Sequence, residues 1–234
     1  VVGLVNARIL KLRQAIGIIM GANIGTTITA HIIRRSDIDG SGNIILGFLK
    51  PTTLAPLAAI VGILTYYASK KVSRRAFGLI LVGFGILFTG MFGMEAAVSP
   101  RRESDVLRQL FASLSNPVLG VLAGAVVTAV IQSSSASIGI LQALTVTGAI
   151  TVSSAYPIIL GQNIGTCITP VLASIGASKN ARRTAVVHVS FNILGTFIFL
   201  IGLYAIQYTI GLPHWGEAIT KGGIADFHTV FNII

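Results

Sequence analysis

The sequence has few charged residues, and acidic residues are especially scarce. Only 10% of its 234 residues are charged, 17 of them basic and 7 acidic, whereas a soluble domain carries about 25%. Hydrophobic residues make up 53% of the chain, and the mean hydropathy is +0.83. This composition excludes an ordinary soluble domain and indicates a protein of the lipid bilayer.

Cysteines and nucleotide-binding motifs are also scarce or missing. Cys167 is the single cysteine, so no disulfide can form within the chain. The sequence contains no glycine-rich phosphate loop of the GxxxxGKS type, which excludes a nucleotide-driven motor within these residues. We therefore expect no cofactor.

The basic residues lie in short segments between apolar runs, as in SKKVSRR (69–75) and SKNARR (178–183). This pattern is typical of the cytoplasmic loops of membrane proteins. The net charge of +10 does not indicate a nucleic-acid partner, because no basic face is interleaved with aromatic residues. The sequence predicts a multi-pass protein of the cell (inner) membrane, in contact with the lipid bilayer.

Long apolar runs predict the membrane-spanning helices. Crossing a bilayer takes about 20 residues, and runs near this length occur at 51–68, 76–98 and 184–206. Residues 12–33 form a further segment with polar residues in its middle. Residues 99–117 alternate charged residues with apolar residues at helical spacing. This alternation predicts a helix that lies along the membrane surface.

Two short apolar stretches flank the polar segment QSSSAS (132–137). The stretches 118–131 and 138–150 are each too short to span a bilayer. We expect a re-entrant hairpin that enters the bilayer and turns back at QSSSAS, where its polar groups line a protein or water cavity. One continuous span through the polar segment is the alternative.

The segments GANIGTTITA (21–30) and GQNIGTCITP (161–170) are near copies. At a constant offset of 140, residues 18–29 match residues 158–169 at nine of twelve positions. With both basic segments in the cytoplasm, the copies run antiparallel across the membrane. Inverted repeats are common in secondary transporters, whose binding sites lie near the midplane between the repeats.

The offset also indicates how the chain is divided. It places a partner of QSSSAS before Val1, so we expect the chain to begin inside its first repeat. HTVFNI (228–233) echoes HVSFNI (188–193), and we expect the last segment to be cut short. The predicted units are a partial first repeat (1–50), connecting helices (51–116), a second repeat (117–210) and the start of a further segment (211–234).

The polar motifs carry no charge. Hydroxyl groups beside free N–H groups at a helix start can bind an oxyanion such as phosphate, and hydroxyl and carboxamide oxygens can coordinate sodium. Small residues that permit close helix packing are the alternative, and for His188 and His228 we favour a structural role. A hydrolase pairing of His188 with Ser133, Ser134 or Ser135 lacks a nucleophile elbow and an acidic partner, so we expect no enzyme.

QSSSAS followed by LGQNIGTCIT and VVHVSFNILG resembles the second repeat of the type II sodium/phosphate cotransporter family. LVNARILKLRQAIGIIMGANIGTTITA resembles the first repeat, and the bacterial branch is the nearer one. The resemblance implies an all-α membrane protein, an inverted-repeat secondary transporter with a re-entrant hairpin and broken helices. It implies sodium-coupled symport of inorganic phosphate by alternating access, with sodium as coupling ion. Transport of another oxyanion, such as sulfate or arsenate, and a non-transporting membrane scaffold are the alternatives, and association into a homodimer is left open.

The family's motifs also imply site residues in this sequence. The first serine motif is absent from the chain, so half of the site expected from the family is missing. The implied phosphate-binding residues are Gln132, Ser133, Ser134, Ser135, Asn23, Gly25, Thr26, Asn163, Gly165 and Thr166. The implied sodium ligands are Gln132, Ser134, Ser137, Asn23, Thr27, Asn163 and Thr169.

Overall fold

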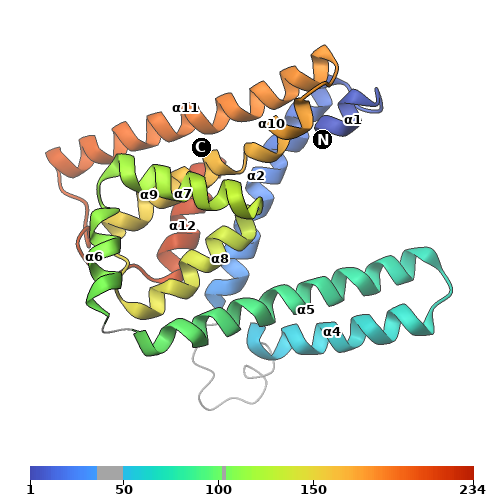
Figure 1. The fold of residues 1–234 in the computed structure, drawn as a ribbon, viewed down its shortest axis with the longest axis horizontal. Coiled ribbons are helices and arrows are strands. Elements are labelled where there is room, and N and C mark those ends of the chain that lie inside the picture. Colours follow the sequence, from blue (N-terminus) through green and yellow to red (C-terminus); the bar gives the residue numbers. More distant parts are fainter. Residues whose placement is uncertain (36–49, 102–103) are drawn as a thin grey trace.

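The structure, a computed structural model, describes residues 1–35, 50–101 and 104–234, which are almost entirely helical (Figure 1). The expected all-α class is therefore confirmed, while the end of the predicted first unit, 36–49, lies outside the described residues. In chain order the helices are α1 (Val2–Asn6), α2 (Leu12–Arg34), α4 (Pro51–Ala68), α5 (Val72–Val98), α6 (Asp105–Ser113), α7 (Pro117–Ile131), α8 (Ser134–Leu144), α9 (Val152–Gly165), α10 (Ile168–Ser174), α11 (Lys179–Thr209) and α12 (Lys221–Ile233).

Four helices of the described residues are long and apolar enough to cross a membrane, namely α2, α4, α5 and α11. They coincide with the four runs predicted from the sequence, and α5 and α11 extend into the basic segments that precede them. In Figure 1 the α4–α5 turn lies at the far right and the α10–α11 turn at the top, right of centre, while α6 lies at the left. Both basic segments thus lie on the side of the molecule away from α6.

Helix α6 lies across the end of α7. The two helices are bent by 106° at their junction, so α6 lies along the membrane surface if α7 enters the bilayer along its normal. Phe111 is buried, whereas Val106 is 75% exposed. The helix predicted within 99–117 is therefore present, and its amphipathic pattern reflects one face on the protein and one face outward.

The chain reverses direction between α7 and α8, at the polar segment. Gln132 has a φ of 58° and ends α7 in the left-handed conformation. Ser133 then caps α8, because its Oγ accepts a hydrogen bond from the backbone N–H of Ala136 at 3.3 Å. A left-handed residue followed by an N-cap ends one helix and begins the next. No continuous helix runs through QSSSAS.

The two sequence copies have equivalent helix starts. Helices α2 and α9 begin at Leu12 and Val152, which are related by the offset of 140, and so are the left-handed residues Arg8 and Gly148. In Figure 1, α2 runs from the upper right toward the bottom, while α9 and α10 run upward. The repeat is thus visible in local backbone structure as well as in sequence.

Broken helices were expected, and the two copies differ in this respect. Helix α9 ends at Gly165 and α10 begins at Ile168, whereas α2 continues through the equivalent residues without interruption. The broken-helix expectation is therefore wrong for the first copy. Pro170 explains the difference, because proline has no N–H for the carbonyl of Thr166 and its ring clashes with that carbonyl. The first copy has Ala30 at the equivalent position.

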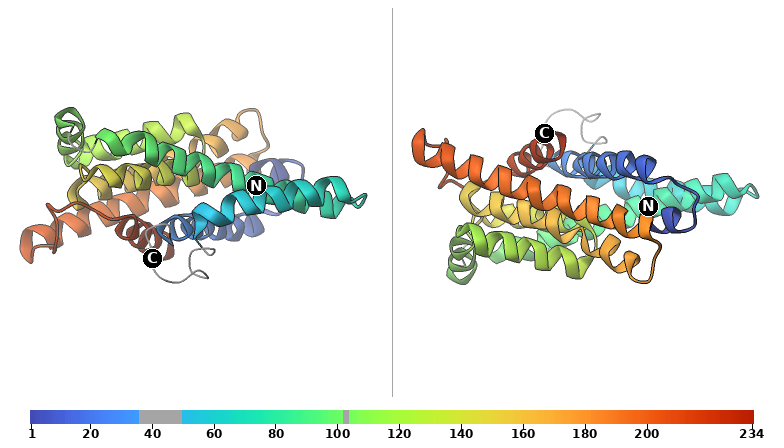
Figure 2. Two further views of the ribbon diagram at one scale, coloured as in Figure 1. Left: turned by 90° about the horizontal axis from the view of Figure 1, so that it is seen from below. Right: turned by 90° about the horizontal axis from the view of Figure 1, so that it is seen from above.

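Each copy is accompanied by one of the helices that carry the His-x-x-Phe-Asn pattern (Figures 1 and 2). Helix α12 lies along α2, where Arg34 and Asp226 form an ion pair at 2.7 Å and His31 Nε2 lies 2.8 Å from Thr229 Oγ1. Helix α11 lies along α9, where Thr196 Oγ1 donates to the carbonyl of Leu160 at 3.3 Å. The repeated pattern thus belongs to two similar helix pairs.

Helices α7 and α9 pack backbone against backbone. Their contact is made by Gly120 and Gly124 on α7 and by Gly161 and Gly165 on α9. A Cβ at Gly161 would overlap the carbonyl oxygen of Val121. Small residues at such spacing let membrane helices approach closely. This contact fixes the hairpin's first arm against the second copy.

Candidate serine-tip transport site

The start of α8 lies between the two copies. We call residues Gln132–Ser135 with Ser137 the serine tip. Ser135 Oγ donates to Thr29 Oγ1 of the first copy at 3.4 Å. On the other side, Gln162 Nε2 of the second copy donates to the carbonyl of Ser137 at 3.0 Å. The structure therefore brings the serine motif into contact with both copies.

Helix α8 presents polar groups at its N-terminus. Ser134 and Ser135 are its first two residues, and the Ser133 hydroxyl caps only the N–H of Ala136. The first N–H groups of a helix have no partner within the helix. Together with the helix dipole, such groups attract anions. Ser137 is buried at 1% exposure, and its hydroxyl lies 2.7 Å from Thr128 Oγ1.

The threonines of the two NIGT motifs bond to their own helices. Thr26 Oγ1 donates to the carbonyl of Ala22 at 3.1 Å and Thr27 Oγ1 to that of Ile24 at 2.6 Å. Thr166 Oγ1 donates to the carbonyl of Asn163 at 2.5 Å. Because each hydroxyl uses its proton locally, its oxygen keeps acceptor capacity for a cation.

The two motif glycines have different surroundings. A Cβ at Gly165 would lie 2.5 Å from the carbonyl oxygen of Ala125, so the absent side chain serves the packing on α7. A Cβ at the equivalent Gly25 would meet no atom within 4 Å. Asn163 is 5% exposed and its Nδ2 donates to the carbonyl of Ile159 at 2.9 Å. Gly165 is therefore explained by helix packing, whereas Gly25 is not.

Several buried carboxamides around the copies have an oxygen without a partner. Asn192 and Asn232 each donate from Nδ2 to the His carbonyl four residues earlier, at 3.0 and 2.8 Å. Gln142 donates to the carbonyls of Ala30 and Lys221 at 3.0 and 2.9 Å. Buried polar atoms without a partner within the described chain are Asn23 Nδ2, Gln142 Oε1, Gln162 Oε1, His188 Nε2, Asn192 Oδ1, His228 Nδ1 and Asn232 Oδ1.

Sequence reasoning did not select Gln142, Gln162, Asn192 or Asn232 as site residues. The available signal was the repeated His-x-x-Phe-Asn pattern, in which His and Asn lie one helical turn apart. Buried polar groups are normally paired, so these carboxamide oxygens are available to accept from a ligand.

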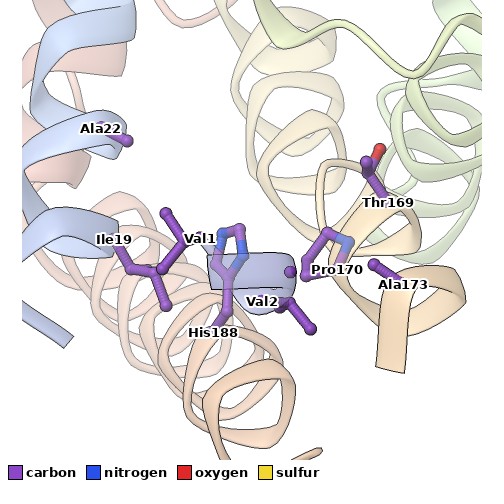
Figure 3. A pocket seen from close by; sticks show the side chains of 9 residues that line it. Val1, Val2, Ile19, Ala22, Thr169, Pro170, Ala173 and His188 are labelled. Carbon is purple, nitrogen blue, oxygen red and sulfur yellow. The ribbon is translucent and has the colours of Figure 1, made fainter. Parts of the chain in front are cut away.

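A cavity of about 220 Å³ lies between the copies (Figure 3). It is lined by Ile19 and Ala22 of α2, by Thr169 and Pro170 of α10, and by His188 of α11. Thr29 follows Ala22 by seven residues, a helical rise of about 10 Å. Thr169 therefore lines this cavity. The cavity lies at another height along α2 than Thr29, the residue that contacts the serine tip.

The sequence matches the Na⁺/Pi-cotransporter family over residues 1–96 and 97–224. The chain belongs to this family. Its members are transporters of sodium and phosphate across membranes, in agreement with the helices long enough to cross a bilayer and with the resemblance found from the motifs.

Similar proteins occur in bacteria and in animals. YqeW of Bacillus subtilis, an uncharacterized protein, is 31% identical over 239 residues, which cover 100% of this chain and 71% of YqeW. YjbB of Escherichia coli, named a putative inorganic phosphate export protein, is 24% identical over 97% of this chain and 39% of its own length. Sodium-dependent phosphate transport protein 2A of Rattus norvegicus is 35% identical over 52% of this chain and 20% of its own length.

The chain thus spans about seven tenths of YqeW and about two fifths of YjbB. No solved structure matches the chain.

Proposed function

We propose that this cotransporter couples sodium to the movement of inorganic phosphate by alternating access at the serine tip. The observation that carries the proposal is the bridging position of the tip, with Ser135 bonded to the first copy and Ser137 to the second. A group that contacts both copies changes its surroundings when one copy moves relative to the other. Substrate binding there can therefore be linked to the movement that alternating access requires.

Phosphate would bind at the first turn of α8. The backbone N–H groups of Ser134 and Ser135 and their hydroxyls are the donors, with the Ser135 hydroxyl turning from Thr29 to the anion on binding, and Gln132 adds a carboxamide. The motif residues Asn23, Thr26, Asn163 and Thr166 of the two copies are the further polar groups we assign. No lysine or arginine belongs to this set, so bound sodium would have to balance the phosphate charge.

Sodium would bind to neutral oxygens. Hydroxyl oxygens of Thr27, Ser137 and Thr169 and the unpartnered oxygens of Gln162, Asn192 and Asn232 are of the hard type that sodium prefers. A buried carboxamide oxygen without a partner costs about 1–3 kcal/mol. A bound cation would remove that cost, which supports a role for these residues in ion binding.

The proposed architecture is an inverted repeat with a re-entrant hairpin. The equivalent helix starts of α2 and α9 and the opposite directions of these helices in Figure 1 support the inverted repeat. Helices α7 and α8, with 15 and 11 residues, are shorter than a bilayer-spanning helix, which supports a hairpin that turns inside the bilayer. We place both basic segments on the cytoplasmic side of the inner membrane.

Replacing Ser135 with alanine is expected to reduce sodium-dependent phosphate transport about 10- to 100-fold. The change removes a hydroxyl that contacts the first copy and, in this proposal, the anion, and a hydrogen bond to a charged group contributes about 1.5–3 kcal/mol. The measurement is uptake of labelled phosphate into proteoliposomes with an inward sodium gradient. The same vesicles loaded with phosphate would measure export.

The matched control is Ser174→Ala, because this exposed hydroxyl bonds only to the carbonyl of Val171 within α10. Its transport should equal that of the parent. Transport without sodium, or equal activity of the Ser135 and Ser174 variants, would refute the proposal. Stronger competition by sulfate or arsenate than by unlabelled phosphate would assign the site to that oxyanion instead.

Replacing Asn192 with alanine is expected to raise the sodium concentration for half-maximal transport about tenfold. The variant loses a cation ligand worth about 1.4 kcal/mol, while the phosphate dependence at saturating sodium should change little. Asn180→Ala is the control, since Asn180 is exposed at the start of the same helix. An unchanged sodium dependence in the Asn192 variant would show that its oxygen binds no sodium.

A further inference from the structure

A second cavity, of about 320 Å³, is lined by residues of α6, α7, α8 and α9 and by none of α2. Its walls include Leu110 and Phe111 of α6, Val127 of α7, Leu141 of α8 and Gln162 of α9. We call it the lateral cavity. No residue that lines the cavity between the copies belongs to it, so it is a separate space.

The lateral cavity runs inward from the outer surface of the protein. At its mouth, Leu110 is 51% exposed and Val127 is 44% exposed. At its floor, Leu141 and Gln162 are each 3% exposed and Ser137 is 1% exposed. A cavity with large apolar side chains at its mouth, on a helix bundle that crosses a bilayer, opens toward lipid.

The walls of the lateral cavity suit a hydrocarbon chain. All its lining side chains are apolar except Ser137 and Gln162 at the floor. The Ser137 hydroxyl lies 2.7 Å from Thr128 Oγ1, and Gln162 Nε2 donates to the carbonyl of Ser137, while Gln162 Oε1 has no partner within the described chain. Apolar cavities do not hold water well, and one of roughly 150 Å³ accommodates benzene. A space twice that size accommodates about a dozen carbon atoms of an extended chain.

The position of α6 adds a partner for a phosphate group. Since α6 and α7 are bent by 106°, α6 would lie at the level of the phospholipid headgroups if α7 runs along the bilayer normal. Arg108 is exposed on α6 and precedes Phe111 by three residues, so the two side chains lie on adjoining parts of the helix surface. An arginine at this level can pair with a lipid phosphate.

We propose that the lateral cavity binds one acyl chain of a membrane phospholipid, with the phosphate of that lipid at Arg108. The chain passes under α6 and ends beside Ser137, behind the serine tip. The lipid site shares Ser137 and Gln162 with the proposed sodium ligands, but it does not require phosphate transport, and a lipid-binding measurement alone can test it.

The test is native mass spectrometry of the protein after reconstitution in vesicles of palmitoyl-oleoyl-phosphatidylglycerol and extraction into detergent. One retained lipid is expected on the parent. Ala123→Phe fills the cavity, because Ala123 is one of its lining residues, and should lower the retained lipid about tenfold. Val127→Trp narrows the mouth of the cavity and should also lower the amount of retained lipid. Since Val127 is exposed, this variant keeps the test valid even if Ala123→Phe folds poorly.

Arg108→Gln should lower retention several-fold, since it removes the phosphate partner and leaves the cavity open. Val130→Phe is the matched control, because Val130 lies on the same helix as Val127, is 78% exposed and does not line the cavity. The control should retain lipid as the parent does. A parent without retained lipid, or filled and narrowed variants that retain it fully, would overturn the proposal.

Discussion

Replacing Gly161 with alanine is expected to destabilise the protein by about 3 kcal/mol or more. The added methyl group would overlap the carbonyl oxygen of Val121 on α7. A backbone atom cannot move aside as a flexible side chain can, and overpacking a close contact costs about 1–3 kcal/mol or more. Unfolding of the detergent-solubilised protein, followed by circular dichroism during an SDS titration, measures the loss.

The repeat supplies a matched control for this prediction. Gly21 is the equivalent glycine of the first copy, and a Cβ there would meet no atom within 4 Å. Gly21→Ala is therefore expected to leave stability unchanged or to raise it by up to about 1 kcal/mol, because alanine favours helix more than glycine does. Equal destabilisation by both substitutions would contradict the packing role of Gly161.

Replacing Lys221 with methionine is expected to destabilise the protein by about 3 kcal/mol. Lys221 is 3% exposed, and its Nζ donates to both carboxylate oxygens of Glu95 at 2.8 Å, which joins α5 to the start of α12. Breaking a buried ion pair leaves an unpaired charge, at a cost of about 3–5 kcal/mol. We expect the lower end of this range, because the Glu95 side chain is 28% exposed and water can solvate its charge.

A double variant separates the contribution of the ion pair to stability from the contributions of its two side chains. In Glu95→Gln with Lys221→Met the carboxylate no longer lacks its lysine, so the loss should be smaller than that of Lys221→Met alone. The same SDS titration measures both variants. A double variant less stable than the Lys221 variant would show that the glutamate stabilises the fold without its lysine.

The sequence determined the features that depend on neighbouring residues. The apolar runs at 51–68 and 184–206 identified α4 and α11, because about 20 apolar residues suffice to specify a membrane helix. QSSSAS marked the end of one helix and the start of another, since serine favours N-cap positions. The offset of 140 identified the repeat. Pro170 carried the signal for a helix break in the second copy, because the first copy has alanine at the equivalent position.

Only the tertiary structure decided which distant groups meet. Ser135 is 106 residues from Thr29, and no local pattern relates the two. The free oxygens of Gln162 and Asn192 and the pairing of Lys221 with Glu95 depend likewise on how whole helices are arranged. Helix formation follows short-range hydropathy and capping, whereas the assembly of a site follows the packing of helices far apart in the chain. For that reason the sequence determined the membrane helices and the family motifs, and the fold alone determined which of their side chains lie in contact.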